Sequence, residues 1–120
     1  MIRCMLESSD GSIRTGGSEL LIEWQRNREG KFWLDIQEED TSGERKLLEN
    51  LGLHTLAVQD AQRDRHPPKL EEFDDFTFVL YRGIASFNSE LVHDSQNIAF
   101  FVGENFLGTC YFVLLHYKKD

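Results

Sequence analysis

The chain has 120 residues, of which 13 are basic and 21 are acidic, so its formal net charge is −8. An acidic surface without a basic stripe repels phosphate backbones, and nucleic acid is therefore not an expected partner. Hydrophobic residues make up 40% of the chain, which fits one compact domain over residues 1–120 and excludes wholesale disorder. No apolar stretch approaches the roughly 20 residues of a membrane helix, so we expect the chain as given to be soluble and unable to transport ions by itself.

The first quarter of the chain predicts a strand, a loose turn region and a helix. Residues 2–6 have the pattern of a strand, and the Ser, Thr and Gly residues of 8–18 predict two turns around a short strand at Ile13. Ser18 is a favoured N-cap residue and predicts a helix start, which residues 27–30 end. The apolar face of this helix would consist of Leu20, Leu21 and Trp24.

A further strand and two helices follow. Residues 32–37 alternate in hydropathy as a strand does, so Trp33 and Asp35 should point away from their apolar neighbours. Thr41 and Glu44 have capping-box spacing and predict a helix that Gly52 closes in a left-handed conformation. A second short helix is predicted over residues 55–62.

The last part of the chain predicts long strands. Prolines at 67–68 end the preceding helix and force an extended backbone. Residues 76–84 and 98–102 are apolar on both faces, which is typical of interior strands covered on both sides. Residues 103–105 form a turn, so the strand at 106–115 pairs with its predecessor as a hairpin.

These elements predict an α/β (α+β) fold, a mixed and partly antiparallel sheet with helices packed on both faces. The side chains expected to be largely buried in it are Trp33, Phe78, Leu80, Ile98 and Phe100.

Catalytic and cofactor motifs are missing from the sequence. It contains no GxSxG elbow, P-loop, GxGxxG or HExxH pattern, and its four histidines are too widely spaced to read as a ligand set. We therefore expect no enzyme activity and no catalytic or cofactor-binding residue. Cys4 and Cys110 form no CxxC pair, and their apolar surroundings predict two reduced, buried thiols. The acidic run at 71–75 suggests a metal site, because hard cations prefer carboxylate oxygens. A charged run just before a buried strand is, however, more often a solvated strand entrance.

Asp60 is the main candidate site residue. On the predicted helix it lies at the edge of the apolar stripe rather than on the solvent face. One interpretation is a helix cap or an ion pair with the nearby Arg63 or Arg65, and the other is a metal ligand. The residues themselves leave both open.

Four segments in order resemble the N-terminal domain of the CorA family of Mg²⁺ and Co²⁺ transporters, over residues 32–109. The first is a Trp-containing strand, and the second runs from a helix end into the stretch that contains Asp60. The third leads from a Pro-Lys pair into an apolar strand, and the fourth is the last hairpin. Their sequences are FWLDI (32–36), LGLH with LAVQD (51–54, 56–60), PKLEEFDDF (68–76) and QNIAFFVGENFLGT (96–109).

The resemblance implies a regulatory role for this domain. In the family it lies at the cytoplasmic face of the inner or plasma membrane, within a homopentamer. Divalent cations bound between subunits keep the pore closed, so Mg²⁺ would be the regulatory ion and Co²⁺ or Zn²⁺ alternatives. The family's regulatory acid maps onto Asp60, with a partner acid from the stalk helix of an adjacent subunit.

The chain also departs from the family pattern. Thr55 stands where Pro is common and Gln59 where Glu is frequent, which weakens the case for a second metal site. The stalk, the transmembrane helices and the Gly-Met-Asn pore signature are absent, so membrane contact would come only through a missing C-terminal part. The alternatives are the zinc-transporting ZntB-like branch, and a generic α/β interaction module or small enzyme.

Overall fold

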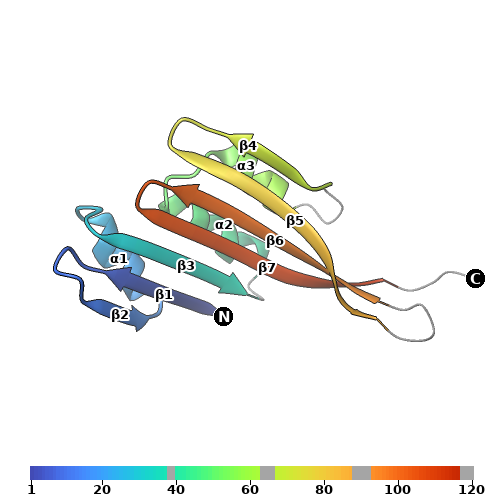
Figure 1. The fold of residues 1–120 in the computed structure, drawn as a ribbon, viewed down its shortest axis with the longest axis horizontal. Coiled ribbons are helices and arrows are strands. Elements are labelled where there is room, and N and C mark those ends of the chain that lie inside the picture. Colours follow the sequence, from blue (N-terminus) through green and yellow to red (C-terminus); the bar gives the residue numbers. More distant parts are fainter. Residues whose placement is uncertain (38–39, 63–66, 88–92, 117–120) are drawn as a thin grey trace, which may run out of the picture.

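The computed structural model describes residues 1–37, 40–62, 67–87 and 93–116. Within these residues, seven strands form one mixed sheet and three helices pack beside it (Figure 1). The strands are β1 (Ile2–Glu7), β2 (Ile13–Gly16), β3 (Lys31–Gln37), β4 (Lys69–Glu72), β5 (Phe76–Phe87), β6 (His93–Gly103) and β7 (Phe106–His116). The helices are α1 (Glu19–Gln25), α2 (Thr41–Asn50) and α3 (Thr55–Ala61).

The strand order is β2-β1-β3-β7-β6-β5-β4. All neighbouring strands are antiparallel except β3 and β7, which run parallel in the middle of the sheet. The parallel pair is possible because two helices and three strands separate β3 from β7, which leaves room for a crossover. The predicted mixed sheet, antiparallel in its second half, is confirmed.

One face of the sheet carries the core. A row of paired residues crosses it from β1 to β5: Cys4 pairs with Leu34, Leu34 with Gly108, Gly108 with Phe101, and Phe101 with Phe78. All five are buried. Since paired residues point to the same face of a sheet, this row defines one buried face. The helices α1, α2 and α3 cover it (Figure 1).

The opposite face has no helix on it within the described part of the chain, so the expectation of helices on both faces is not met there. Trp33 is 41% exposed, Tyr81 56% and Val102 45%. The prediction that Trp33 is largely buried was wrong, because β3 alternates and its neighbours take the helix side. Ile98 and Phe100 also face this way and are half-buried, whereas Phe78 and Leu80 are buried as predicted.

The helix starts differ in detail from the sequence predictions. Ser18 makes no side-chain capping bond. The α2 helix is capped by Asp40, whose Oδ1 accepts a hydrogen bond from the Gly43 amide at 2.6 Å. Thr41, the predicted cap, is instead the first helical residue. His54 caps α3 by accepting the Leu56 amide at its Nδ1, at 3.1 Å.

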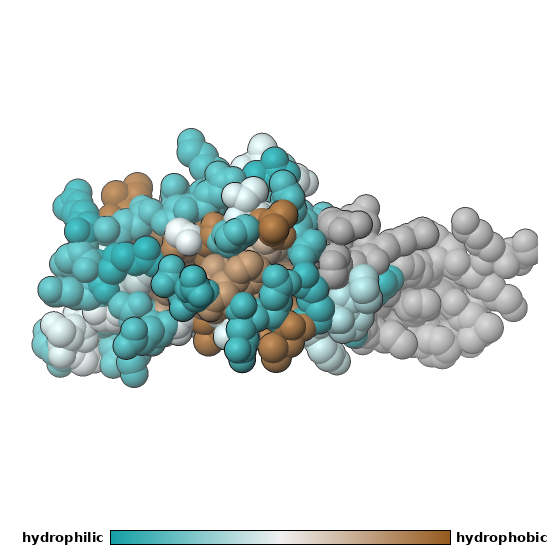
Figure 2. Space-filling model, turned by 90° about the horizontal axis from the view of Figure 1, so that it is seen from above, coloured by the Kyte–Doolittle hydropathy of each residue, from teal (hydrophilic) through white to brown (hydrophobic). Residues whose placement is uncertain are grey.

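The molecule is elongated, with extents of 56 × 28 × 24 Å. The length comes from β5, β6 and β7, which extend beyond the helix layer (Figure 1). Figure 2 looks from above onto the β4 side and shows hydrophobic residues in the middle of that view, with hydrophilic residues around them. None of the helices in the described segments has the length and apolarity needed to cross a membrane.

Candidate functional site

Asp60 lies where α3 ends beside the edge strand β4. It occupies the last turn of the helix, one residue before Ala61. Lys69 and Glu71 are two positions apart on β4, so both side chains point to the same side of that strand. The sheet pairing of Lys69 with Leu80, a core residue, places this side toward the helices.

These three residues form a charged cluster. The Nζ of Lys69 lies 2.6 Å from Oδ2 of Asp60 and 2.7 Å from Oε2 of Glu71. The side chains of Asp60 and Lys69 are 20% and 26% exposed, and that of Glu71 is 44% exposed. Hydrogen bonding to Asp60, and then to Glu71, raises the pKa of Lys69 above its ordinary value. The ammonium therefore stays charged and is shared by two carboxylates.

The donor chemistry of this cluster suits a hard cation, but the ligand set is small. Mg²⁺ prefers carboxylate oxygens and keeps several waters when few protein ligands are present. Asp60 and Glu71 supply two such carboxylates. Among the residues that the structure describes, no group of three or more His, Cys, Asp or Glu side chains is placed to hold a metal ion. A divalent cation here would therefore need waters, or ligands from outside this chain, and would meet the Lys69 ammonium.

The sequence predicted Asp60 as the candidate but not its observed partner. It pointed to Arg63 and Arg65, which lie outside the described residues. Lys69 and Glu71 could have been found from their spacing of two, had the segment after the prolines been interpreted as a strand. The other acids of the run at 71–75, namely Glu72, Asp74 and Asp75, are exposed.

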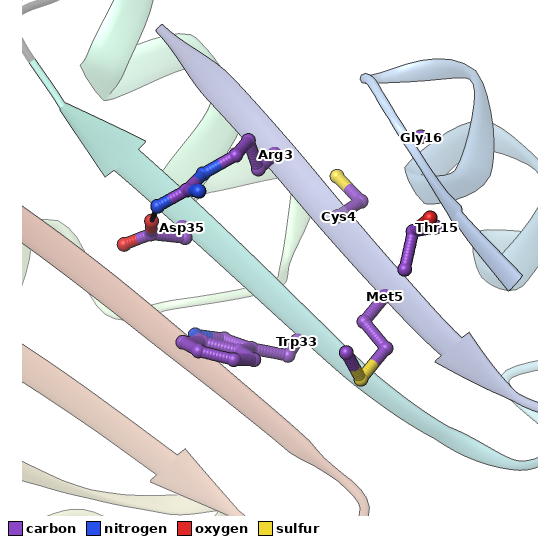
Figure 3. A pocket seen from close by; sticks show the side chains of 7 residues that line it. All are labelled: Arg3, Cys4, Met5, Thr15, Gly16, Trp33 and Asp35. Carbon is purple, nitrogen blue, oxygen red and sulfur yellow. Dashed lines mark hydrogen bonds and ion pairs between the residues drawn. The ribbon is translucent and has the colours of Figure 1, made fainter. Parts of the chain in front are cut away.

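A hollow lies elsewhere, on the helix-free face over β1, β2 and β3. It measures about 490 Å³. Figure 3 shows Trp33 and Met5 side by side over the strands, with Arg3 reaching Asp35. The hollow is lined by Arg3, Cys4, Met5, Thr15, Gly16, Trp33 and Asp35.

The charged side chains beside this hollow, Arg3 and Asp35, are bonded to each other, and Thr109 joins them. Asp35 accepts hydrogen bonds from Arg3 at 3.2 Å and from the Thr109 hydroxyl at 2.7 Å. The Trp33 indole donates to the same hydroxyl at 3.0 Å. Such a network fixes β3 to β7 and orients Trp33, and it leaves an apolar, aromatic surface rather than a reactive group.

Both cysteines are buried and free, as the sequence predicted. Burial, with a smaller effect from Glu19, raises the pKa of Cys4 to about 11. Burial raises the pKa of Cys110 well above its usual value, and the charges of Glu44 and Asp35 add to the effect. Thiols in this state are poor nucleophiles and poor metal ligands.

The sheet with three helices on one face, and the cluster of Asp60, Lys69 and Glu71 at its edge, defines an α/β domain. A family model described as CorA-like Mg²⁺ transporter protein matches residues 29–111. The chain belongs to this family of transporter proteins. The match agrees with the resemblance expected over residues 32–109. A search of curated proteins found no significant match.

Solved structures share the fold. The soluble domain of CorA from Methanocaldococcus jannaschii has a TM-score of 0.60 at 16% identity, over 97% of this chain and 41% of that one. The complete CorA magnesium transporter of the same organism has a TM-score of 0.64 at 18% identity, over 99% of this chain and 33% of that one. The full-length CmaX protein has a TM-score of 0.64 at 16% identity, over 90% of this chain and 33% of that one. This chain thus spans between a third and about two fifths of the length of these structures.

Proposed function

We propose that this chain is the cation-sensing regulatory domain of a CorA-like divalent-cation transporter, acting at the cytoplasmic face of the membrane. Asp60 is the proposed ligand, and Mg²⁺ is the proposed regulatory ion, with Co²⁺ as an alternative. Cations bound between subunits of a homo-oligomer, a pentamer in the full-length protein, would hold the pore closed. The observation that carries the proposal is the position of Asp60 at the end of α3, within a charged cluster, in a chain of this family.

The small size of the ligand set supports a site shared between subunits. One or two carboxylates with waters bind Mg²⁺ poorly, because Mg²⁺ releases its hydration shell reluctantly. A further acid from a neighbouring subunit would supply the missing oxygens. The isolated chain is therefore expected to bind Mg²⁺ only weakly, with a Kd in roughly the millimolar range.

The test is a flux assay on a chimera in which this domain replaces that of a full-length relative. Asp60→Ala should raise the internal Mg²⁺ concentration needed to close the pore. Asp74→Ala is the matched control, because it removes an exposed acid from the neighbouring run and should leave closure unchanged. Urea unfolding of the 120-residue chain with each change checks that the effect is not a general loss of stability.

One result of this assay would contradict the proposal, and a second assay identifies the ion. Closure of the Asp60→Ala chimera at the parent's Mg²⁺ concentration would show that Asp60 is only an acid at a helix end. Repeating the assay with Zn²⁺ separates a magnesium-responsive protein from one of the zinc-transporting branch.

A further inference from the structure

The ammonium group of Lys69 lies between the carboxylates of Asp60 and Glu71. Its Nζ is within hydrogen-bond distance of both Asp60 and Glu71, at 2.6 and 2.7 Å. It also lies 5.8 Å from the centre of the buried Phe78 ring, at the edge of the core. The side chains of Asp60 and Lys69 are mostly shielded from water, so their attraction is screened less than that of a fully exposed pair.

The position of Asp60 at a helix C-terminus makes a nearby positive charge favourable. Asp60 lies in the last turn of α3, and that turn contains no basic residue. The unpaired carbonyl groups at a helix C-terminus add negative potential, which disfavours an acid there and favours a cation. Lys69, from the neighbouring strand, brings one positive charge to Asp60 in this structure.

We propose that Lys69 is a built-in competitor of the regulatory cation: it neutralises Asp60 while the cation is absent and leaves Asp60 when the cation binds. The inference rests on the proposed role of Asp60 as a ligand. Glu71 retains the ammonium after the exchange, since it lies on the same strand, is the more exposed acid and already contacts Nζ. Asp60 is then the one carboxylate of this cluster that the cation takes. The flexible four-carbon stem of Lys69 allows this movement without a change in the backbone.

Two consequences follow for the site. Lys69 raises the cation concentration at which the site fills, because every binding event must break an existing ion pair. It also holds the carboxylates of Asp60 and Glu71 close together in the metal-free protein, where they would otherwise repel each other. Lys69 would thus set the threshold of the sensor without being a ligand.

The test uses the 120-residue chain and MgCl₂ at constant ionic strength, with binding followed by calorimetry and by NMR. Lys69→Met keeps the aliphatic stem and removes the charge, so Mg²⁺ should bind about three- to tenfold more tightly. Lys46→Met removes the same charge from an exposed position on α2 and controls for net charge. The Lys69→Arg chain should bind Mg²⁺ with nearly the Kd of the original chain. Combining Asp60→Asn with Lys69→Met should abolish the tighter binding that Lys69→Met causes alone.

A Lys69→Met chain that binds Mg²⁺ no more tightly than the Lys46→Met chain would overturn the proposal. Retention of the gain in the double variant would also overturn it, because the site would then not be Asp60. The original chain gives a second measurement that does not depend on any variant. Its Lys69 side-chain ¹⁵N signal should shift during the Mg²⁺ titration, with the same apparent Kd as the amide of Asp60, and a constant signal would again refute the exchange.

These readouts are separate from the flux assay. If Lys69→Met tightens binding but the Asp60→Ala chimera closes normally, Lys69 competes at a site that does not gate the pore. If the chimera loses closure but Lys69→Met has no effect, the sensor role stands and the competitor role fails.

Discussion

Adjacent residues on one strand of this protein have opposite surroundings. On β3, Leu34 is fully buried under the helices, whereas Trp33 is 41% exposed on the helix-free face. The polar Asp35 shares the face of Trp33 and is bound by Arg3 and Thr109. The strand alternation was readable from the sequence, but the absence of cover over Trp33 in the described chain was not. A large aromatic side chain in a strand is usually buried, whereas Trp33 lies on the uncovered face and its indole donates a hydrogen bond to Thr109.

The buried thiols give a prediction at this scale. With its pKa raised to about 11 from 9.0, Cys4 should carry about a hundredfold less thiolate than an exposed cysteine at pH 8, and react correspondingly slowly with a disulfide reagent. Because the folded-state pKa is raised, burial of the protonated thiol contributes stability below about pH 9, which is lost as the pH rises toward 11. Reaction rates measured from pH 7 to 9, with and without urea, check this.

Repeating the measurement on the Cys4→Ala and Cys110→Ala chains shows which cysteine gives which reaction rate. If either thiol reacts in the folded chain as fast as in urea, the burial of that cysteine is not as described here.

At the scale of elements, sequence patterns located the helices better than they identified the capping groups. The left-handed residue after α2 is Gly52, with φ +82°, as predicted. The N-cap of that helix is Asp40 rather than Thr41, one position earlier, and α3 is capped by a histidine ring. Asp, Ser and Thr have similar capping ability, so several adjacent residues compete and the observed backbone selects one.

A pair of substitutions distinguishes the two caps of α2. Asp40→Ala removes the acceptor of the Gly43 amide and should lower the free energy of unfolding by about 1 kcal/mol. Thr41→Ala leaves that bond in place, so its effect should be well below that of Asp40→Ala. Urea unfolding of the two chains gives the comparison, and a larger loss for Thr41→Ala would restore the capping box predicted from the sequence.

The short strand β4 shows how neighbouring elements create the candidate site. Residues 69–72 carry three charged side chains and one Leu, a composition that does not suggest a strand. They form one because β5 offers a free edge, and edge strands commonly carry charge. This pairing brings Lys69 and Glu71 to Asp60.

At the scale of the whole molecule, the two faces of the sheet differ in cover. The helix-free face exposes Trp33, Tyr81 and Val102, and the hollow beside Trp33 is lined partly by apolar side chains. Isolated apolar side chains at a surface are common, but a group of them on one sheet face favours contact with another surface.

We expect the isolated chain to be monomeric or weakly dimeric at micromolar concentrations, with association through this face. The physical reason is that an uncovered apolar face gains by burial, while the net charge of −8 opposes close approach. Light scattering over a concentration series measures this, and Val102→Lys, which places a charge on the face, should reduce any association. A stable pentamer of the 120-residue chain would contradict the expectation.

The sequence by itself determined the family, the order of most elements and the identity of Asp60 as the candidate residue. The order of the elements follows from local patterns, such as hydrophobic period and turn residues. The family, and with it the metal interpretation of Asp60, follows from four short segments that resemble the family in order. The tertiary structure decided which sheet face the helices cover, which residue caps each helix and which cation stands beside Asp60. Each of these depends on residues distant in sequence: Lys69 meets Asp60 only because β4 pairs with β5 while α3 packs on the same sheet. Alternation tells which side chains share a face, but only the packing of the other elements decides which face is covered.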